Sequence, residues 1–275
     1  MIIGVVIQAR SSSTRLPDKV LLEMPYGSGI TVLQQVIRRV KKAKLVNSII
    51  IATTIEPEDE RIVDIANLEG VKYSRGSKEN VLERYYFAAK ENNLDIVLRI
   101  TSDCPCIDPE QIDEAIRVFQ NLNIGYVSNS LERTFMHGLD IEVFSFKSLE
   151  NAYLSAVEDY DLEHVTPYIK KVNTMHNIVA DGENFAPDIR ITLDTPEDYA
   201  FLLLIYDFLY YNNNIFPSVE IVKLIKQKPW LKLINKTVVQ KRKINSMEDE
   251  IAEAIKILEL QGLKNAAIYL KKYHP

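Results

Sequence analysis

Short, wholly apolar runs alternate along the first half of the chain with segments whose apolar residues recur every three or four positions. The apolar runs are typical of strands buried on both faces of a sheet, and the periodic segments are typical of helices that pack one face on it. The predicted strands cover residues 2–7, 48–52, 71–73 and 95–100, and the predicted helices cover residues 31–40, 58–68, 80–90 and 109–119. This alternation favours a mostly parallel sheet with helices on both sides.

The pattern becomes less regular after residue 120. Apolar runs predict strands at residues 125–127 and 140–144, and shorter extended pieces at Ile178 and at residues 189–193. Helical spacing returns at residues 148–157, 162–171 and 196–210. We therefore expect the second half to add mixed or antiparallel strands and to provide a platform for a substrate.

The composition shifts after a run of three asparagines at residues 212–214. Residues 219–275 contain 12 lysines and arginines but 6 acidic residues, so this part is basic. One predicted helix there has an apolar stripe and ends near Gly262, and a second covers residues 265–273; the stripe consists of Met247, Ile251, Ala254, Ile255 and Leu258. We predict a first domain over residues 1–211 and a basic helical extension over residues 215–275, with the asparagine run as the linker.

Bulk composition narrows the class of protein. The chain has 275 residues, 47% hydrophobic and 26% charged, and its formal net charge of −5 gives no basic field for nucleic acid. Cys104 and Cys106 are too close in sequence for an unstrained bridge, which favours a reducing cytoplasm. No apolar run reaches about 18 residues, and the apolar start lacks the basic residues of a signal peptide. We expect a soluble cytoplasmic protein with no membrane segment.

The segment at residues 8–19 follows the first predicted strand directly and offers three cations, Arg10, Arg15 and Lys19, together with four hydroxyl groups. Ligands of open α/β sheets bind beyond the carboxyl ends of the strands, where this segment lies. Guanidinium and ammonium groups suit the oxygens of a nucleoside triphosphate. A solvated surface loop is the alternative reading, and the Gly-x-x-x-x-Gly-Lys pattern of a Walker A loop is absent.

Two aspartates follow predicted extended segments. Asp103 comes just after the strand at residues 95–100, and Asp194 comes after residues 189–193 and before a helix. Mg²⁺ is usually bound by one or two carboxylates together with phosphates and water, so this pair could share one ion. The alternative is a turn residue for Asp103 and the N-cap of the helix starting at Pro196 for Asp194.

Three motifs together resemble sugar-nucleotide cytidylyltransferases. They are Gln8-Ala9-Arg10-x-x-Ser13-Thr14-Arg15-Leu16-Pro17-x-Lys19, the Ser-Asp-x-Pro at residues 102–105, and the Asp-Thr-Pro-Glu-Asp at residues 194–198. The family includes the enzymes that make CMP-ketodeoxyoctonate and CMP-sialic acids, and the nearest resemblance is to the group named for spore-coat polysaccharide biosynthesis. The resemblance covers about residues 1–210 and implies a three-layer, Rossmann-like nucleotide-diphospho-sugar transferase fold with a mixed, mostly parallel sheet. Asp18 stands where the family often has glycine.

The resemblance implies roles for individual residues. Arg10, Lys19, Asp103 and Asp194 would be the catalytic set, with Mg²⁺ on the two aspartates. The nucleotide site would comprise Gln8, Ala9, Arg10, Ser13, Arg15, Lys19, Arg75, Ser77, Asn80 and Arg84. The acceptor site would comprise Asp140, Glu142, His164 and Arg190, which lie in or near segments similar to family motifs. Core hydrogen bonds, helix caps and, for Arg84, a surface helix charge remain alternatives.

The implied reaction is transfer of CMP from CTP to an acidic sugar or to a phosphorylated polyol or sugar, with release of pyrophosphate, in cell-surface polysaccharide biosynthesis. The family also implies a homodimer. Two alternatives stay open at this point: an enzyme that uses another nucleoside triphosphate, and a non-catalytic binding protein that acts through the basic extension. The residues do not name the acceptor.

Overall fold

The computed structural model describes residues 1–122, 124–212, 214–238 and 246–273. The chain forms two compact units, residues 1–234 and residues 235–275, which are considered separately below. Asn213 of the predicted linker and residues 239–245 and 274–275 of the basic extension lie outside the described residues.

The first unit is built on one mixed sheet, whose strands in the described residues are β1 (Ile3–Gln8), β2 (Ser48–Thr54), β3 (Lys72–Gly76), β4 (Ile96–Thr101), β5 (Tyr126–Ser128), β6 (Glu142–Ser145) and β7 (Met175–Asn177). Their order across the sheet is β3-β2-β1-β4-β6-β5-β7. The pairs β3–β2, β2–β1, β1–β4 and β5–β7 are parallel, while β6 is antiparallel to β4 and to β5. The expected mixed, mostly parallel sheet is confirmed.

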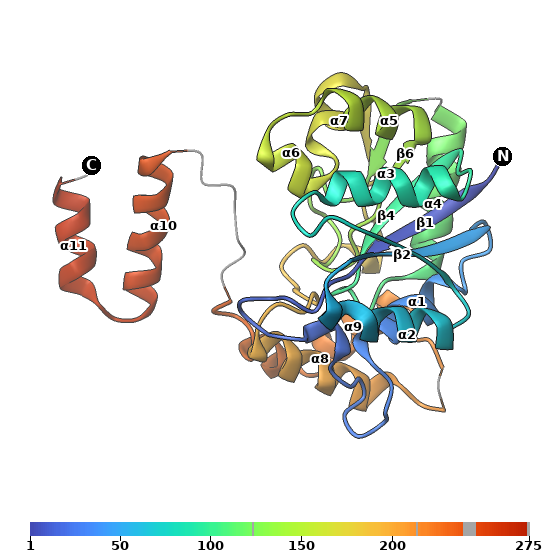
Figure 1. Cartoon of the computed structure of the whole chain (residues 1–275). Helices are drawn as coiled ribbons and strands as arrows, with labels where there is room; N and C mark the ends of the chain where they lie inside the picture. The colour runs from blue at the N-terminus through green and yellow to red at the C-terminus, as the bar shows by residue number, and fades with distance from the viewer. Residues whose placement is uncertain (123, 213, 239–245, 274–275) are drawn as a thin grey trace. The chain divides into compact units, whose positions relative to one another are not determined.

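Helices cover both faces of this sheet (Figure 1). The helices of the first unit are α1 (Val32–Val40), α2 (Glu60–Leu68), α3 (Val81–Glu91), α4 (Pro109–Leu122), α5 (Phe146–Ser155), α6 (Asp159–His164), α7 (Pro167–Val172), α8 (Pro196–Leu209) and α9 (Ser218–Gln227), with short 3-10 turns at Lys19–Leu21, Pro57–Asp59, Gly182–Asn184 and Pro229–Leu233. Val5 and Ile7 pack with α1, α2 and α4, whereas Val6 packs with α3, α5 and α7. This alternation explains why β1 is apolar throughout: a strand between two helical layers has no solvent face.

A further apolar cluster joins α8 and α9 to residues 135–139 and 189–193. Because Ile221, Val222 and Ile225 of α9 are buried in it, the first compact unit continues to Ile234 and does not end at residue 211 as predicted. The basic composition that begins near residue 219 therefore marks no structural boundary. Part of it comes from Lys223 and Lys226, which lie on the side of α9 that is not buried.

The predicted helix at residues 162–171 is wrong, because two short helices, α6 and α7, meet there. Pro167 begins α7, and a proline cannot continue a helix that runs into it. Val165, between them, has a positive φ of 70°. The extended piece at residues 189–193 forms only an isolated bridge between His137 and Arg190 and is not part of the sheet.

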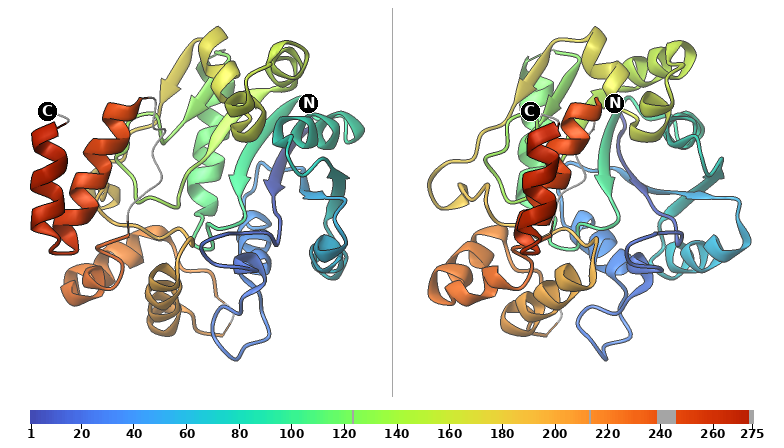
Figure 2. Two further views of the ribbon diagram at one scale, coloured as in Figure 1. Left: turned by 60° about the vertical axis from the view of Figure 1, so that its left-hand side comes forward. Right: turned by 90° about the vertical axis from the view of Figure 1, so that its left-hand side faces the viewer.

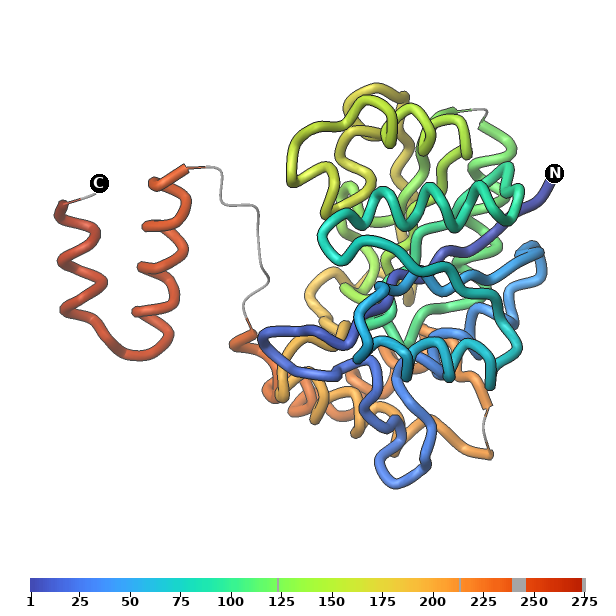
Figure 3. Tube along the Cα trace, in the orientation of Figure 1, coloured from blue at the N-terminus to red at the C-terminus, as the bar shows by residue number. Residues whose placement is uncertain are grey.

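The order of the strands positions the site. From β1 the chain moves to β2 and β3 on one side and then returns to β4 on the other, so β1 and β4 are parallel neighbours with Gln8 opposite Thr101. Such a reversal of strand order opens a crevice beyond the carboxyl ends of the two strands. The long segment that connects β1 to α1, blue in Figure 3, starts there, and so does the turn that carries Asp103.

The second unit contains α10 (Met247–Leu260) and α11 (Lys264–Tyr273). Ser246 caps α10, with its side chain accepting a hydrogen bond from the Asp249 backbone N–H at 3.1 Å. Gly262 has a φ of 74° in the turn between the helices, a conformation that suits glycine. In the described residues of both units, no helix is long and apolar enough to span a bilayer.

Candidate functional site

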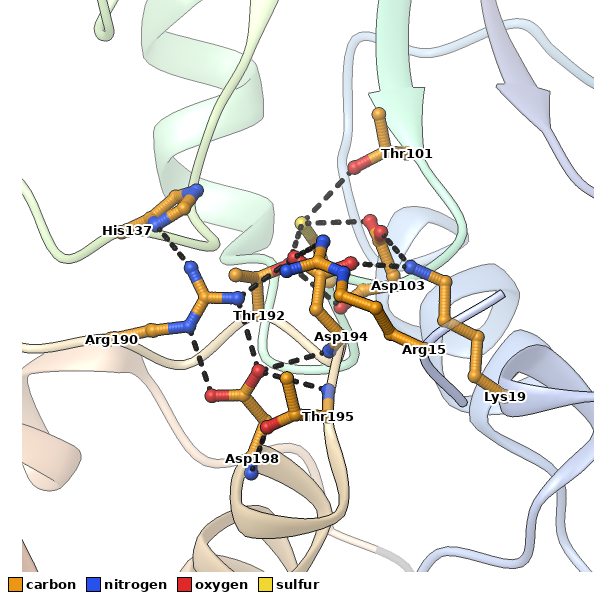
Figure 4. Close-up of polar contacts among 11 residues, drawn as sticks. Arg15, Lys19, Thr101, Asp103, His137, Arg190, Thr192, Asp194, Thr195 and Asp198 are labelled. Carbon is orange, nitrogen blue, oxygen red and sulfur yellow. Dashed lines mark hydrogen bonds and ion pairs between the residues drawn. The ribbon is translucent and has the colours of Figure 1, made fainter. Parts of the chain in front are cut away.

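Lys19 lies between two carboxylates that come from distant parts of the sequence (Figure 4). Its Nζ is 2.6 Å from Asp103 Oδ2 and 2.8 Å from Asp194 Oδ1. Burial opposes the charged form of all three groups, but their mutual attraction outweighs it: the pKa of Lys19 is raised, and the pKa values of Asp103 and Asp194 are lowered. All three side chains are therefore charged near neutral pH.

Backbone contacts bring the two aspartates together. The Asp103 carbonyl oxygen accepts hydrogen bonds from the Leu193 N–H at 2.8 Å and from Thr192 Oγ1 at 3.3 Å. The segment before Asp194 is thereby fixed against the turn after β4. Two carboxylates that share one positive charge are also able to share a metal ion, so the pair fits the predicted magnesium site.

Asp194 is not the N-cap of α8. Thr195 takes that place: its side chain accepts a hydrogen bond from the Asp198 N–H at 3.3 Å, and the Asp198 carboxylate accepts one from the Thr195 N–H at 3.2 Å. The Asp194 carboxylate instead meets Arg15 at 3.2 Å and Arg190 at 2.8 Å, besides Lys19. The capping alternative for Asp194 is wrong, and its carboxylate belongs to the cationic cluster.

The shape of the loop at residues 8–19 depends on two further carboxylates. The Ser11 N–H donates to Oδ1 of the buried Asp59 at 2.7 Å, and the Asp18 N–H donates to the Ser11 carbonyl at 3.1 Å. Asp18 has a φ of 54°, which explains why glycine suits this position and why aspartate, which tolerates that conformation, can replace it. The Asp18 carboxylate forms an ion pair with Arg61 at 2.7 Å. Its negative charge is therefore balanced by a cation outside the loop.

Arg10 and Arg84 form a second cationic element of the site. Arg84 is almost fully buried and donates to the carbonyls of Ser77 and Lys78, the latter at 3.1 Å. Burial, followed by the neighbouring Arg10 cation, lowers the pKa of Arg84 to about 10. Among the described residues, Arg10 has no hydrogen-bond or ion-pair partner, and Arg84 Nε and Gln8 Oε1 are buried without one. This arrangement favours an anion between the two guanidinium groups.

The predicted base-binding segment after β3 is held by internal contacts. The Arg75 guanidinium donates to the Thr54 and Glu56 carbonyls at 2.9 and 3.1 Å and pairs with Glu60 at 2.6 Å. Asn80 caps α3 by accepting from the Glu83 N–H at 2.9 Å, and its own N–H donates to Ser77 Oγ at 3.1 Å. These contacts shape the loop between β3 and α3, and the roles of Arg75, Ser77 and Asn80 toward a base stay predictions.

Glu142, a predicted acceptor ligand, lies in a buried network. It pairs with Arg99 and accepts hydrogen bonds from Tyr126 and, at 2.6 Å, from Thr166, while Lys170 Nζ is 3.5 Å away. Burial alone would raise the pKa of Glu142, but the Arg99 and Lys170 cations outweigh it and lower the value to about 2. Glu142 is therefore ionised at neutral pH, and its contacts link β6 to β4 and to α7.

The other predicted acceptor residues are each held by different partners. Asp140 makes a two-point ion pair with Arg133 at 2.7 and 3.0 Å. His164 is exposed at the end of α6, packs edge-on against Tyr160 with 4.4 Å between ring centroids, and has a pKa lowered by partial burial. Arg190 lies with Asp194 instead. An acceptor role for all four stays a prediction.

Arg190 is the centre of an interaction set that only the structure shows. It donates to both oxygens of the fully buried Asp198, at 2.9 and 3.0 Å, and its NH1 is 3.0 Å from His137 Nδ1. Neither Asp198 nor His137 was predicted to belong to the site. The motif at residues 194–198 contained Asp198, but nothing in its spacing distinguished it from a surface residue of the first helical turn.

No group of three or more His, Cys, Asp or Glu side chains in the described ranges could hold a metal ion by itself. The magnesium site on Asp103 and Asp194 stays a prediction. Cys104 and Cys106 are buried free thiols whose pKa values are raised by burial, as suits unreactive core residues.

Comparison with known proteins decides the family. A family model described as cytidylyltransferase matches residues 4–217. The chain belongs to the cytidylyltransferase family. The resemblance found in the three sequence motifs is thereby confirmed.

Two relatives and one solved structure match most of the chain. The uncharacterized protein MJ1063 of Methanocaldococcus jannaschii is 38% identical over 244 residues, which cover 87% of this chain and 96% of that protein. The spore coat polysaccharide biosynthesis protein SpsF of Bacillus subtilis is 30% identical over 234 residues, covering 82% and 94%. The solved structure of a cytidylyltransferase from Leptospira borgpetersenii superposes with a TM-score of 0.79 at 32% identity, covering 88% of this chain and all of that one.

Proposed function

We propose that this cytidylyltransferase-family protein transfers CMP from CTP to an acceptor oxygen and releases pyrophosphate. The observation that carries the proposal is the convergence of Lys19 on Asp103 and Asp194 beyond the carboxyl ends of β1 and β4. Cations and ionised carboxylates at one strand edge suit a triphosphate and its metal ion together.

In this proposal the cations position the triphosphate. Arg10 and Arg84 bind phosphate oxygens in the space between them, and Lys19 and Arg15 stand on the side of the aspartates. The site is largely set before the nucleotide arrives, because backbone contacts fix the loop at Ser11 and the Asp103–Leu193 junction. Positioning and charge stabilisation dominate nucleotidyl transfer, so such an arrangement is what the reaction needs.

We propose Asp103 and Asp194 as the ligands of Mg²⁺. Both carboxylates are kept ionised by the neighbouring cations, and both already face one positive charge, the Lys19 ammonium. When bound, the ion would neutralise charge on the α-phosphate and on the departing pyrophosphate.

The acceptor in the proposal is an acidic sugar or a phosphorylated polyol or sugar, consistent with the polysaccharide role in the name of the Bacillus relative. Near neutral pH the lowered pKa leaves His164 mostly uncharged, so it is able to take the acceptor proton through a water molecule. We further propose a cytoplasmic homodimer that supplies an activated sugar for cell-surface polysaccharide.

Pyrophosphate release by the full chain tests this proposal. CTP, UTP, ATP and GTP are each supplied with Mg²⁺ and with ketodeoxyoctonate, a sialic acid or a phosphorylated polyol as acceptor. The proposal predicts release with CTP and one of these acceptors, and a background rate with UTP. Equal rates with UTP and CTP would remove the cytidylyl assignment.

The same preparation tests the binding-protein alternative. A non-catalytic protein would release pyrophosphate with none of the triphosphates and would be retained on heparin, an anionic polymer, through its basic extension. Release with CTP in a chain that heparin does not retain would exclude that alternative.

A further inference from the structure

The Lys19 ammonium lies at the place that a metal ion would take between the two carboxylates of the site. It bridges Asp103 Oδ2 at 2.6 Å and Asp194 Oδ1 at 2.8 Å, and the segment that follows β1 and carries it runs beside the segment that enters α8 in Figure 2. Only 15% of the Lys19 side chain and 21% of each aspartate side chain are exposed. Oxygen ligands of Mg²⁺ lie about 2.1 Å from the ion, so an ion and an ammonium that bridge the same two oxygens exclude each other.

The charges in direct contact at this point already balance. Asp194 also pairs with Arg15 at 3.2 Å and with Arg190 at 2.8 Å, and Arg190 pairs with Asp198 at 2.9 Å. The set therefore contains three cations and three carboxylates: Lys19, Arg15 and Arg190 with Asp103, Asp194 and Asp198. A divalent ion that arrived alone would add uncompensated positive charge to a largely buried site, which is unfavourable at low dielectric.

The Lys19 side chain is able to leave the aspartates without breaking other hydrogen bonds. In the part of the chain that the structure describes, the two carboxylates are the only hydrogen-bond partners of its Nζ. The backbone of Lys19 stays in a short 3-10 turn that the fully buried Val20 anchors. Phosphate oxygens are strong acceptors for an ammonium. A triphosphate on the loop thus offers Lys19 new partners and supplies the negative charge that a divalent ion requires.

We propose that Lys19 keeps divalent ions off Asp103 and Asp194 until a nucleoside triphosphate binds. Lys19 takes the place of the metal ion in the empty site and becomes a phosphate ligand in the loaded one. While the site is empty, this contact also keeps two largely buried carboxylates paired, and an unpaired buried charge is costly. The inference rests on the proposed metal role of the two aspartates. It implies that the triphosphate and the ion each strengthen the binding of the other by the same factor.

Binding of Mn²⁺ to the full chain without nucleotide tests the inference, since carboxylate sites accept Mn²⁺ in place of Mg²⁺. The free ion is measured by electron paramagnetic resonance. Lys19→Met keeps most of the aliphatic stem and removes the charge, so we expect it to bind Mn²⁺ at least about tenfold more tightly than the wild type. Lys19→Arg keeps the charge and should bind as weakly as the wild type. Lys72→Met, at the exposed first residue of β3, is the matched control and should also bind weakly.

Further variants locate the ion and keep the test decisive. Adding Asp103→Asn to Lys19→Met should abolish the gain, and Lys19→Gln replaces Lys19→Met if that variant does not fold. Unchanged Mn²⁺ affinity in the folded variant that lacks the Lys19 charge would overturn the proposal, as would a wild-type chain that binds Mn²⁺ equally tightly without nucleotide. Calorimetry of CTP binding in the presence of Mn²⁺ tests the metal pair separately: affinity unchanged by Asp103→Asn alone would contradict the proposed metal site itself.

Discussion

The Lys19 ammonium lies 2.6 Å from Asp103 Oδ2, although 84 residues separate the two in sequence. The neighbouring parallel strands β1 and β4 bring them together, since Lys19 lies on the loop that leaves one and Asp103 on the turn that leaves the other. The same ammonium contacts Asp194 at 2.8 Å. One cation thus marks the point where two separate carboxylates meet, and the proposed reaction centre is built around it.

Asp103→Asn should reduce turnover by roughly 100-fold or more, because one carboxylate of the proposed metal pair loses its charge while the side chain keeps its shape. Steady-state pyrophosphate release measures the effect, and circular dichroism checks the fold. Asp64→Asn, at an exposed position of α2, is the matched control and should keep wild-type turnover. Wild-type activity in Asp103→Asn would remove Asp103 from the reaction centre.

Arg190→Lys should raise the Mg²⁺ concentration needed for half-maximal activity while the acceptor KM stays close to wild type. Lysine keeps the charge but loses the planar fork that holds Asp194 and Asp198 together. Titrations of Mg²⁺ and of acceptor separate this positioning role from the predicted acceptor-binding role. A rise in acceptor KM alone would favour acceptor binding, and Arg133→Lys serves as the comparison because Arg133 pairs with Asp140 instead.

The fold and the residues at the centre of the site could be predicted from the sequence because both depend on local patterns. Apolar runs identified β1, β2 and β4, and strand ends then located residues 8–19 and Asp103. The end of the first unit could not be predicted, because α9 is held by contacts with α8 that no local pattern shows. The buried network around Glu142 could not be predicted for the same reason, because the partners of Glu142 come from three separate elements. The only sign of this network in the sequence was Arg99, a charged residue inside an apolar strand.

Asp18 offers a test of backbone conformation in the phosphate loop. Asp18→Gly should change stability little, because glycine removes the left-handed strain while the half-exposed ion pair with Arg61 is worth at most about 1 kcal/mol. Asp18→Val should cost about 1–2 kcal/mol more, since a β-branched residue is disfavoured at positive φ. Urea unfolding gives both values. Equal stability of the Gly and Val variants would contradict the left-handed conformation.

Glu142 should make stability depend on pH in the acid range. Its pKa falls from 4.5 to about 2 on folding, so its contribution is complete above pH 4.5 and is lost as the pH falls toward 2. Glu142→Gln should therefore show a flatter decline than the wild type between pH 5 and 2, although it is less stable at pH 7. Urea midpoints across this range measure the difference, and parallel wild-type and variant curves would contradict the assignment.

Nucleotide binding tests the central claim most directly, because it needs no knowledge of the acceptor. Calorimetric titration of the full chain with CTP and with UTP, with and without Mg²⁺, should show one CTP site, tighter with Mg²⁺ and at least about tenfold weaker for UTP. Arg10→Gln should weaken CTP binding by a similar factor, while Lys72→Gln, at an exposed position of β3, should not. Equal affinity for CTP and UTP, or CTP binding unchanged in Arg10→Gln, would contradict the account.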